Sequence, residues 1–255
     1  MATQIYFIGA GPGDPELLTI KGKRIIEQAD VIIYADSLIN SSVCSFAQNE
    51  AEVYKSASLN LDEITEIILS AVKQGKIVAR LQSGDPSIYG AISEQIAILE
   101  EHGIQYEIVP GVSSIFAAAA SIKAELTMPE LSQTLIITRA EGKTAVPPKE
   151  RLNSLARHQA TLAIFLSISL IDKVVEELID GGYAGETPVV VIHRASWDDE
   201  VVIRATLNDI AQRVHILDIK KQALILVGKV LDSTERKDYR SKLYNKDFNH
   251  THRQG

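Results

Sequence analysis

Short apolar runs alternate along this chain with segments in which apolar residues recur at helical spacing. The runs that predict strands cover residues 4–8, 31–34, 77–81, 106–109, 134–138, 162–166, 189–193, 201–205 and 223–227. Helical spacing predicts a helix over residues 61–72, which Asn60 and Glu63 begin as a capping box and Gly75 ends. Residues 170–178, closed by two glycines soon afterwards, predict a second helix.

This alternation is typical of parallel sheets covered by helices. We expect an α/β fold of two lobes, with mixed, largely parallel sheets and a cleft between the lobes. The join falls near residues 110–120, where a Pro-Gly turn leads into a run of alanines. The expected domains are residues 1–114, residues 115–232 and a basic, flexible tail over residues 233–255.

Composition and charge exclude several classes of function. The chain has 255 residues, of which 45% are hydrophobic, and a single cysteine, Cys44, so we expect neither a disulfide framework nor a structural zinc site. The net charge of −7 argues against nucleic-acid binding, although residues 233–255 carry +3. His250 and His252 in this tail are expected to be solvated. No apolar run approaches the roughly 18 residues that span a bilayer, so we expect a cytoplasmic protein without a membrane partner.

The first predicted strand is followed by GAGPGDP, residues 9–15. A dinucleotide fingerprint is Gly-x-Gly-x-x-Gly running directly into a helix. Here the spacing is Gly-x-Gly-x-Gly, Pro12 removes a backbone donor, and the next helical pattern begins only near Thr19. We therefore expect a rigid loop beside the strand ends. Asp36, after the second strand, can mimic a ribose-binding acid, so a nicotinamide-dependent oxidoreductase remains an alternative.

Two further loops follow predicted strands, namely SGDPSIYG at residues 83–90 and PGVSS at residues 110–114. Asp85 in the first of them either caps the helix expected at residues 93–99 or accepts a hydrogen bond from an ammonium group. Ligands bind at the carboxyl ends of strands in open α/β sheets. The three loops are therefore expected to converge on one site.

Four segments together, GAGPGDPELLT, IIYADSL, SGDPSIYGA and VPGVSS, resemble the tetrapyrrole methyltransferase family, whose members use S-adenosylmethionine on porphyrin and corrin precursors. The resemblance covers nearly all of the chain up to about residue 232 and does not include the basic tail. It implies a two-lobed α/β enzyme with S-adenosylmethionine as cofactor and S-adenosylhomocysteine as product. It also implies a tetrapyrrole or corrin macrocycle as substrate, a homodimer, and no metal bound by the protein.

Three later segments, AELT at residues 124–127, TRAEG at 138–142 and ASWDDE at 195–200, narrow the resemblance. They are similar to family members that methylate C11 of cobalt-precorrin-4 or precorrin-4 in cobalamin biosynthesis. The alternatives are members that act on C2 and C7 of uroporphyrinogen III, or on C17 or C20 of the corrin ring. A non-catalytic tetrapyrrole carrier also remains open, because the implied chemistry requires no nucleophile from the protein.

By this resemblance, the cofactor contacts come from both lobes and are largely made by the main chain. They are Pro12, Ser83, Gly84, Asp85, Ile88, Ser113, Ser114, Leu166, Ala195, Ala223 and Leu224. Ser83 and Ala195 stand where relatives carry glycine. An uncharged adenosine and a short amino-acid chain need shape and backbone donors more than a basic phosphate cradle.

The resemblance also implies that Asp36 and Lys55 handle protons, with Asp36 as a general base, although the segment around Lys55 departs from the glycine-bearing version of some relatives. Trp197 either stacks on the macrocycle or packs within the second lobe.

The macrocycle carries many carboxylates, so we expect a basic rim near the strand ends to bind them. The residues expected to contact the substrate are Gly11, Arg80, Arg139 and Arg194, with Lys143 also near this rim.

Overall fold

The computed structural model describes residues 4–232, and its contacts divide them into two compact units. Unit 1 comprises residues 4–117 together with Ala195–Asp198, and unit 2 comprises Ala118–Arg194 together with residues 199–232. The expected tail, including His250 and His252, lies outside the described residues.

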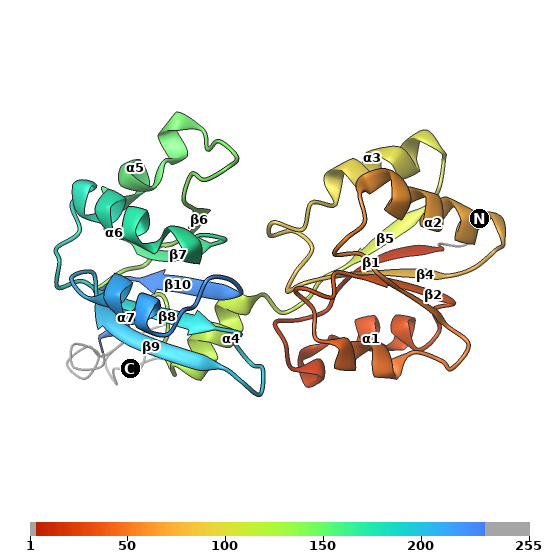
Figure 1. Ribbon diagram of the computed structural model, residues 1–255, viewed down its shortest axis with the longest axis horizontal. Coiled ribbons are helices and arrows are strands. Elements are labelled where there is room, and N and C mark those ends of the chain that lie inside the picture. The colour runs from red at the N-terminus through yellow and green to blue at the C-terminus, as the bar shows by residue number, and fades with distance from the viewer. Residues whose placement is uncertain (1–3, 233–255) are drawn as a thin grey trace, which may run out of the picture. The chain divides into compact units, whose positions relative to one another are not determined.

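Unit 1 is built on a parallel sheet with strand order β3-β2-β4-β1-β5 (Figure 1). Its strands are β1 (Ile5–Gly9), β2 (Val31–Tyr34), β3 (Glu52–Lys55), β4 (Val78–Gln82) and β5 (Tyr106–Val109). Successive side chains of a strand face opposite sides of a sheet. Ile8 accordingly packs with α1 (Ile20–Ile26), whereas Phe7 packs with α2 (Leu61–Lys73) and α3 (Ser93–Glu101) on the other face.

Helix α2 begins with the capping box that the sequence predicts. The Asn60 side chain accepts a hydrogen bond from the Glu63 amide at 3.0 Å, and the Glu63 carboxylate accepts one from the Asn60 amide at 2.8 Å. Gly75 follows the helix with φ of 74°, the left-handed conformation of a helix stop. Both ends of this helix are thus set by local sequence.

Unit 2 contains a mixed sheet with strand order β6-β7-β10-β8-β9. Its strands are β6 (Leu135–Arg139), β7 (Thr161–Phe165), β8 (Pro188–His193), β9 (Val201–Thr206) and β10 (Ala223–Val227). β6 and β7 are parallel, and the other neighbouring pairs are antiparallel.

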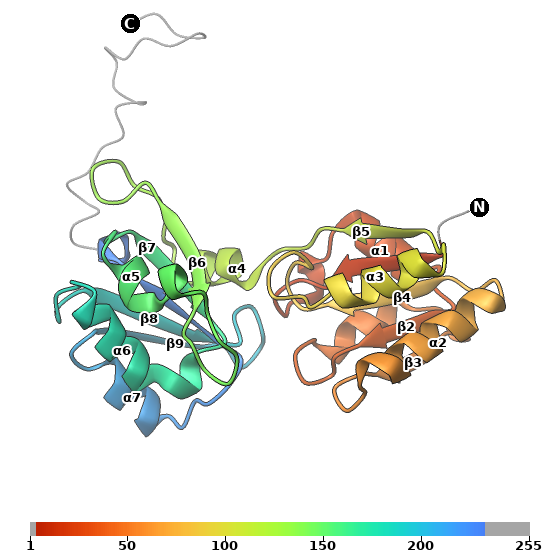
Figure 2. The same cartoon turned by 90° about the horizontal axis from the view of Figure 1, so that it is seen from above.

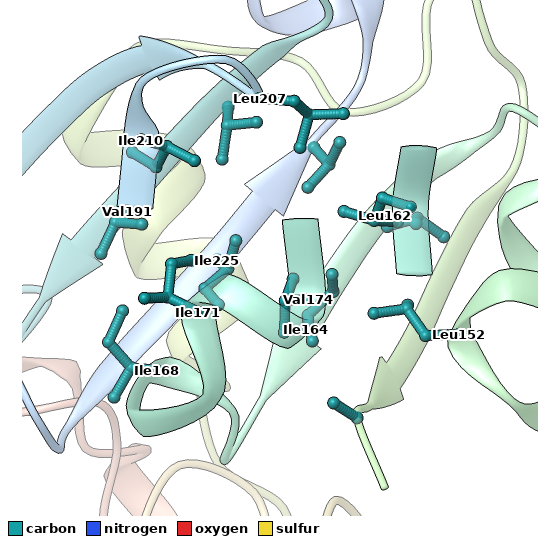
Figure 3. Packing of buried hydrophobic residues seen from close by; sticks show 14 of the residues in the cluster. Leu152, Leu162, Ile164, Ile168, Ile171, Val174, Val191, Leu207, Ile210 and Ile225 are labelled. Carbon is teal, nitrogen blue, oxygen red and sulfur yellow. The ribbon is translucent and has the colours of Figure 1, made fainter. Parts of the chain in front are cut away.

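One face of this second sheet is covered by α5 (Leu152–Ala156), α6 (Ile171–Asp180) and α7 (Ile210–Ile216) (Figure 2). Figure 3 shows the resulting core, in which Leu162 and Ile225 of the strands pack with side chains from the helices. The remaining helix, α4 (Ser114–Ser121), crosses the boundary between the units. The structure also contains the short 3-10 helices η1 (Pro15–Leu17), η2 (Ser41–Phe46), η3 (Pro148–Glu150), η4 (Ile168–Leu170) and η5 (Lys229–Leu231).

The expected α/β class, with largely parallel and mixed sheets, is confirmed. The sequence pattern missed β3, because this edge strand of four residues is largely exposed and presents no apolar run. It also missed α4, α5 and α7, each of which has eight residues or fewer. No helix within residues 4–232 has the length and apolar character of a membrane span.

Candidate functional site

The carboxyl ends of the five parallel strands of unit 1 lie at one edge of the sheet, and the loops after β1 and β4 meet there. The Gly11 amide donates a hydrogen bond to the Gly84 carbonyl at 3.3 Å, and the Gly84 amide donates to the Gly11 carbonyl at 2.8 Å. This two-residue bridge joins GAGPGDP to SGDPSIYG. Both glycines have positive φ, 76° at Gly11 and 65° at Gly84, which favours glycine at each position.

The loop after β5 joins them through a close approach of glycine backbones. A Cβ atom built on Gly111 would lie 2.2 Å from the Gly84 carbonyl oxygen, and one built on Gly9 would lie 2.5 Å from the Gly111 Cα. Only glycine fits at these two positions because backbone atoms, which cannot swing away, fill the space. The structure therefore brings the three predicted loops together, as expected.

Asp85 holds the second and third loops together. One carboxylate oxygen accepts a hydrogen bond from the Gly111 amide at 2.8 Å, and the other accepts from the Ser87 amide at 2.9 Å and from the Ser87 hydroxyl. Partial burial raises the pKa of Asp85, but these hydrogen bonds outweigh it, so the pKa lies below its ordinary value. The capping role is wrong, because α3 begins only at Ser93 and has no side-chain cap.

The other unit 1 candidates surround these loops. Pro12 is buried, Ser83 is exposed and Ile88 is half-buried. Ser113 is buried, and its hydroxyl accepts a hydrogen bond from the Ile115 amide at 3.4 Å. Ser114 is the first residue of α4. Main-chain groups and small side chains thus dominate this set, and Asp85 is its only ionisable member.

Leu166, directly after β7 in unit 2, is 66% exposed and has φ of 53°. The next residue, Ser167, is completely buried. Its hydroxyl donates to the Phe165 carbonyl at 2.6 Å and accepts from the Ala140 amide at 2.8 Å. A large apolar side chain held exposed in a left-handed conformation is typical of a functional position.

Ala223 and Leu224 lie at the same edge of the second sheet as Leu166. They begin β10, which runs antiparallel to β7 and β8, and Ala223 pairs with His193 at the end of β8. The start of β10 is therefore beside the ends of its two neighbours. Ala195, expected in the second lobe, is buried and is counted with unit 1 instead.

The two candidates for proton handling are exposed at the ends of neighbouring parallel strands. Lys55 is the last residue of β3 and pairs with Tyr34, the last residue of β2. Asp36 comes two residues after β2, and its carboxylate accepts a hydrogen bond from the Ala57 amide at 3.3 Å. The fold thus places both side chains at the carboxyl edge of the unit 1 sheet.

Arg80 differs from the expected exposed position on a rim. It lies in the middle of β4, is only 7% exposed, and the loss of solvent lowers its pKa to about 10. Its guanidinium donates to the Gln95 side chain at 3.2 Å, to the Ile33 carbonyl at 3.3 Å and to the Ser56 hydroxyl at 3.1 Å. The rim position is wrong because Arg80 is turned inward toward α3. A substrate contact by Arg80 stays a prediction.

The other substrate candidates have different surroundings. Arg139, at the end of β6, donates hydrogen bonds to the carbonyls of residues 140, 144 and 145 and so organises its own loop. Arg194 forms an ion pair with Asp199, Lys143 is exposed, and Gly11 is buried in the bridge described above. Within the described residues, no three His, Cys, Asp or Glu side chains are grouped as a metal site requires.

Comparison with known proteins identifies the family. The family model described as "Tetrapyrrole (Corrin/Porphyrin) Methylases" matches residues 4–211. The chain belongs to the tetrapyrrole methylases. The predicted resemblance is therefore confirmed, and the nicotinamide-dependent alternative is wrong. In agreement, the glycine loop of this methylase leads into η1 and only then into α1, which begins at Ile20.

Relatives of this methylase include the cobalt-precorrin-4 C(11)-methyltransferase of Methanocaldococcus jannaschii, which is 59% identical over 98% of this chain and 96% of that protein. The X-ray structure of a cobalt precorrin-4 methyltransferase, described as a cobalamin biosynthetic enzyme, has a TM-score of 0.87 at 49% identity, covering 89% of this chain and 95% of that one. The uroporphyrin-III C-methyltransferase of Thermus thermophilus, solved in complex with S-adenosylhomocysteine, has a TM-score of 0.76 at 29% identity, covering 89% and 93%.

Two side chains of this methylase that hold the glycine loop were not assigned that role from sequence. The Trp197 indole nitrogen donates to the Pro12 carbonyl at 2.9 Å, and the Asn40 amide donates to the Gly13 carbonyl at 3.1 Å. Packing of Trp197 within the second lobe is therefore wrong, because residues 195–198 belong to unit 1, and stacking on the macrocycle stays a prediction. The contact with Pro12 joins residues 185 positions apart, a separation that no local pattern reveals.

Proposed function

We propose that this chain transfers a methyl group from S-adenosylmethionine to C11 of precorrin-4 or cobalt-precorrin-4 in cobalamin biosynthesis. The observation that carries the proposal is the identity of 59% over 98% of the chain with a relative named for that reaction. The three second-half segments, at residues 124–127, 138–142 and 195–200, support the same position on the ring.

The chemistry of the candidate residues fits the cofactor. The unit 1 set, Pro12, Ser83, Gly84, Asp85, Ile88, Ser113 and Ser114, offers backbone groups and one carboxylate but no cation. We propose that Asp85, which the lowered pKa keeps ionised, favours a positively charged group nearby. In unit 2, Leu166 offers an exposed apolar surface for a base, and Ala223 and Leu224 lie beside it. Ala195 completes the proposed set.

S-adenosylmethionine supplies an activated methyl group on sulfur, so the protein needs no nucleophile of its own. Catalysis then consists mainly of holding the reacting atoms in line, an effect that lowers barriers by about 7 to 11 kcal/mol at its upper range, and of excluding water. We propose that the carboxylate of Asp36 accepts the proton that the ring loses, with Lys55 beside it on the same sheet edge. The proposed contacts to the macrocycle are Gly11, Arg80, Arg139 and Arg194, with Lys143 near them.

The experiment that tests the proposal is incubation of the purified protein with precorrin-4, with or without cobalt, and S-adenosylmethionine carrying a labelled methyl carbon. We expect a product heavier by one methyl group, with the labelled carbon bonded to C11 in the NMR spectrum. A label at C2, C7, C17 or C20 would identify a sibling activity instead. Binding of the macrocycle without turnover would identify a carrier.

We also propose that the protein is a cytoplasmic homodimer without a metal of its own, as the family resemblance implies. The free thiol of Cys44 agrees with a reducing compartment. Sedimentation of the purified protein tests the dimer, and metal analysis of the same sample tests the absence of a bound metal.

A further inference from the structure

The segment Ala195–Asp198 contacts the glycine loop after β1, although the residues on either side of it in the sequence belong to unit 2. The Trp197 indole donates a hydrogen bond to the Pro12 carbonyl at 2.9 Å, and the Ser196 hydroxyl accepts one from the Asp14 amide at 3.0 Å. We call these two hydrogen bonds the clasp. They lie on either side of Gly13, so the clasp fixes both ends of the same short stretch.

The clasp explains why residue 13 is glycine. A Cβ atom at this position would lie 2.1 Å from Cδ1 and 2.2 Å from Nε1 of Trp197. The backbone of Gly13 itself does not have the positive φ that disfavours other residues. The requirement for glycine therefore arises from the indole ring above it and not from the turn.

The segment that carries the clasp adopts costly backbone conformations. Arg194 has φ of 52° and Ser196 has φ of 67°, and neither is glycine. Such conformations cost free energy and persist only where the surrounding structure enforces them, which is typical of functional sites. Ala195, a proposed cofactor contact, lies between these two residues.

The clasp is connected through hydrogen bonds to the other two loops of the group. Pro12 and Gly13 directly follow Gly11, which is bridged to Gly84, and the loop of Gly84 is joined to Gly111 through Asp85. Because methyl transfer depends on alignment, a displacement of the order of 1 Å in such a loop can reduce the rate about 100-fold. Within this group of three loops, the clasp holds the loop after β1, at Pro12 and Asp14.

We propose that Trp197 and Ser196 are positioning residues for methyl transfer, which hold Pro12 and Asp14 and thereby keep the glycine loop in the conformation that the reaction needs. This inference rests on the proposed function. Neither side chain takes part in the chemistry. Both act through the backbone of the loop.

The test compares variants that remove one hydrogen bond each. Trp197→Phe keeps an aromatic ring but removes the indole N–H, and Ser196→Ala removes the acceptor for the Asp14 amide. Tyr183→Phe is the matched control, because it also removes a single hydrogen bond, from the Tyr183 hydroxyl to the Ala160 carbonyl in the core of unit 2, and neither residue belongs to the proposed site. For each protein, kcat, the KM for S-adenosylmethionine and the unfolding temperature are measured.

We expect Trp197→Phe to lower kcat about tenfold while the KM changes less than about threefold, as a loss of alignment predicts. Ser196→Ala should lower kcat in the same direction by a smaller factor. Tyr183→Phe should lower the unfolding temperature by a few degrees and leave kcat unchanged. Wild-type kcat in both clasp variants would overturn the proposal, whatever their stability.

A second measurement separates this inference from the proposed function. Trp197 is the only tryptophan of the sequence, so tryptophan emission reports on the clasp alone. Gly13→Ala should shift this emission and lower the unfolding free energy of the protein. In a protein that already carries Trp197→Ala, the same change should lower the unfolding free energy only slightly, because the indole ring is no longer there to clash. If the wild type neither binds S-adenosylhomocysteine nor turns over, the proposed function fails. The clasp then stands if Gly13→Ala and Trp197→Ala are coupled and is overturned if their effects add.

Discussion

Leu166 combines two unfavourable features, since its large apolar side chain is exposed and its backbone is left-handed. We expect Leu166→Ala to weaken binding of S-adenosylhomocysteine about tenfold, because a buried leucine side chain contributes about 1.5–3 kcal/mol. Leu166→Gly should weaken it to a similar extent but relieve the left-handed strain. It should therefore be about 0.5–1 kcal/mol more stable than Leu166→Ala.

Titration calorimetry and urea unfolding of these two variants separate function from stability. Higher stability of the glycine variant together with weaker binding would show that the strain at Leu166 is kept for ligand binding. An alanine variant that binds as tightly as the wild type would remove Leu166 from the cofactor set.

The lowered pKa of Asp85 predicts how the stability of the protein depends on pH. Its pKa is lowered by folding, so its carboxylate contributes stability above the unfolded pKa, near 3.8, which is lost as the pH falls through the lower folded value. Asp85→Asn keeps one acceptor oxygen but turns an amide toward either Gly111 or Ser87, at a cost of about 1–3 kcal/mol. The difference in unfolding free energy between wild type and variant should be constant from neutral pH to about 5 and shrink below about 4.

Urea unfolding at a series of pH values measures that difference directly. A difference that stays constant into the acid range would mean that the charge of Asp85 makes no contribution and that only its shape is required.

At the scale of the element, β4 holds a buried cation inside the unit 1 sheet. Among the described residues, no carboxylate forms an ion pair with Arg80, and three uncharged groups on β2, α3 and the segment after β3 accept its hydrogen bonds. Arg80→Lys keeps the charge but cannot supply the same donors. It should lower the unfolding free energy by about 2–4 kcal/mol.

Arg24→Lys is the control, because Arg24 is exposed on α1 and should tolerate the change. Urea unfolding gives the stability of both variants, and steady-state kinetics gives the KM for the macrocycle. Wild-type stability of Arg80→Lys with a KM raised about tenfold would instead place the guanidinium in the substrate site.

The elements that could be predicted from sequence are those with a local signature. β1, β2 and β4 are buried on both faces and appear as largely apolar runs, interrupted in β4 by Arg80, and the capping box of α2 depends on residues only three positions apart. The glycine loop could be distinguished from a dinucleotide fingerprint because its proline and spacing are also local. β3 could not be predicted, because most of its side chains are exposed and its sequence has no apolar run that would indicate its pairing with β2.

The meeting of the loops could be predicted because each follows a strand, whereas contacts between residues far apart in the sequence could not. The ends of parallel strands share one edge, which is why Asp36, Lys55 and the three glycine-bearing loops lie there. The burial of Arg80 depends on Gln95 and Ser56, on elements that pack over it only after folding. The contact of Trp197 with Pro12 depends on the chain returning to unit 1 late in the sequence.

At the scale of the whole molecule, the net charge opposes the proposed substrate. The chain carries −7, the macrocycle carries several carboxylates, and of the candidate arginines Arg80 is buried and Arg194 is paired with Asp199. Approach of the macrocycle should therefore be repelled at long range. Raising the ionic strength from about 10 to 150 mM shortens the screening length from about 30 to 8 Å, and we expect kcat/KM for the macrocycle to rise several-fold.

The affinity for S-adenosylhomocysteine provides the control, because this zwitterion has no net charge and should bind with nearly the same Kd at both ionic strengths. Steady-state kinetics and calorimetry in the two buffers supply the comparison. A fall in kcat/KM with added salt would mean that local attraction outweighs the net charge. Arg139 and Lys143, near the end of β6, would then be the side chains to replace first, because they are not buried and, within residues 4–232, no carboxylate forms an ion pair with them.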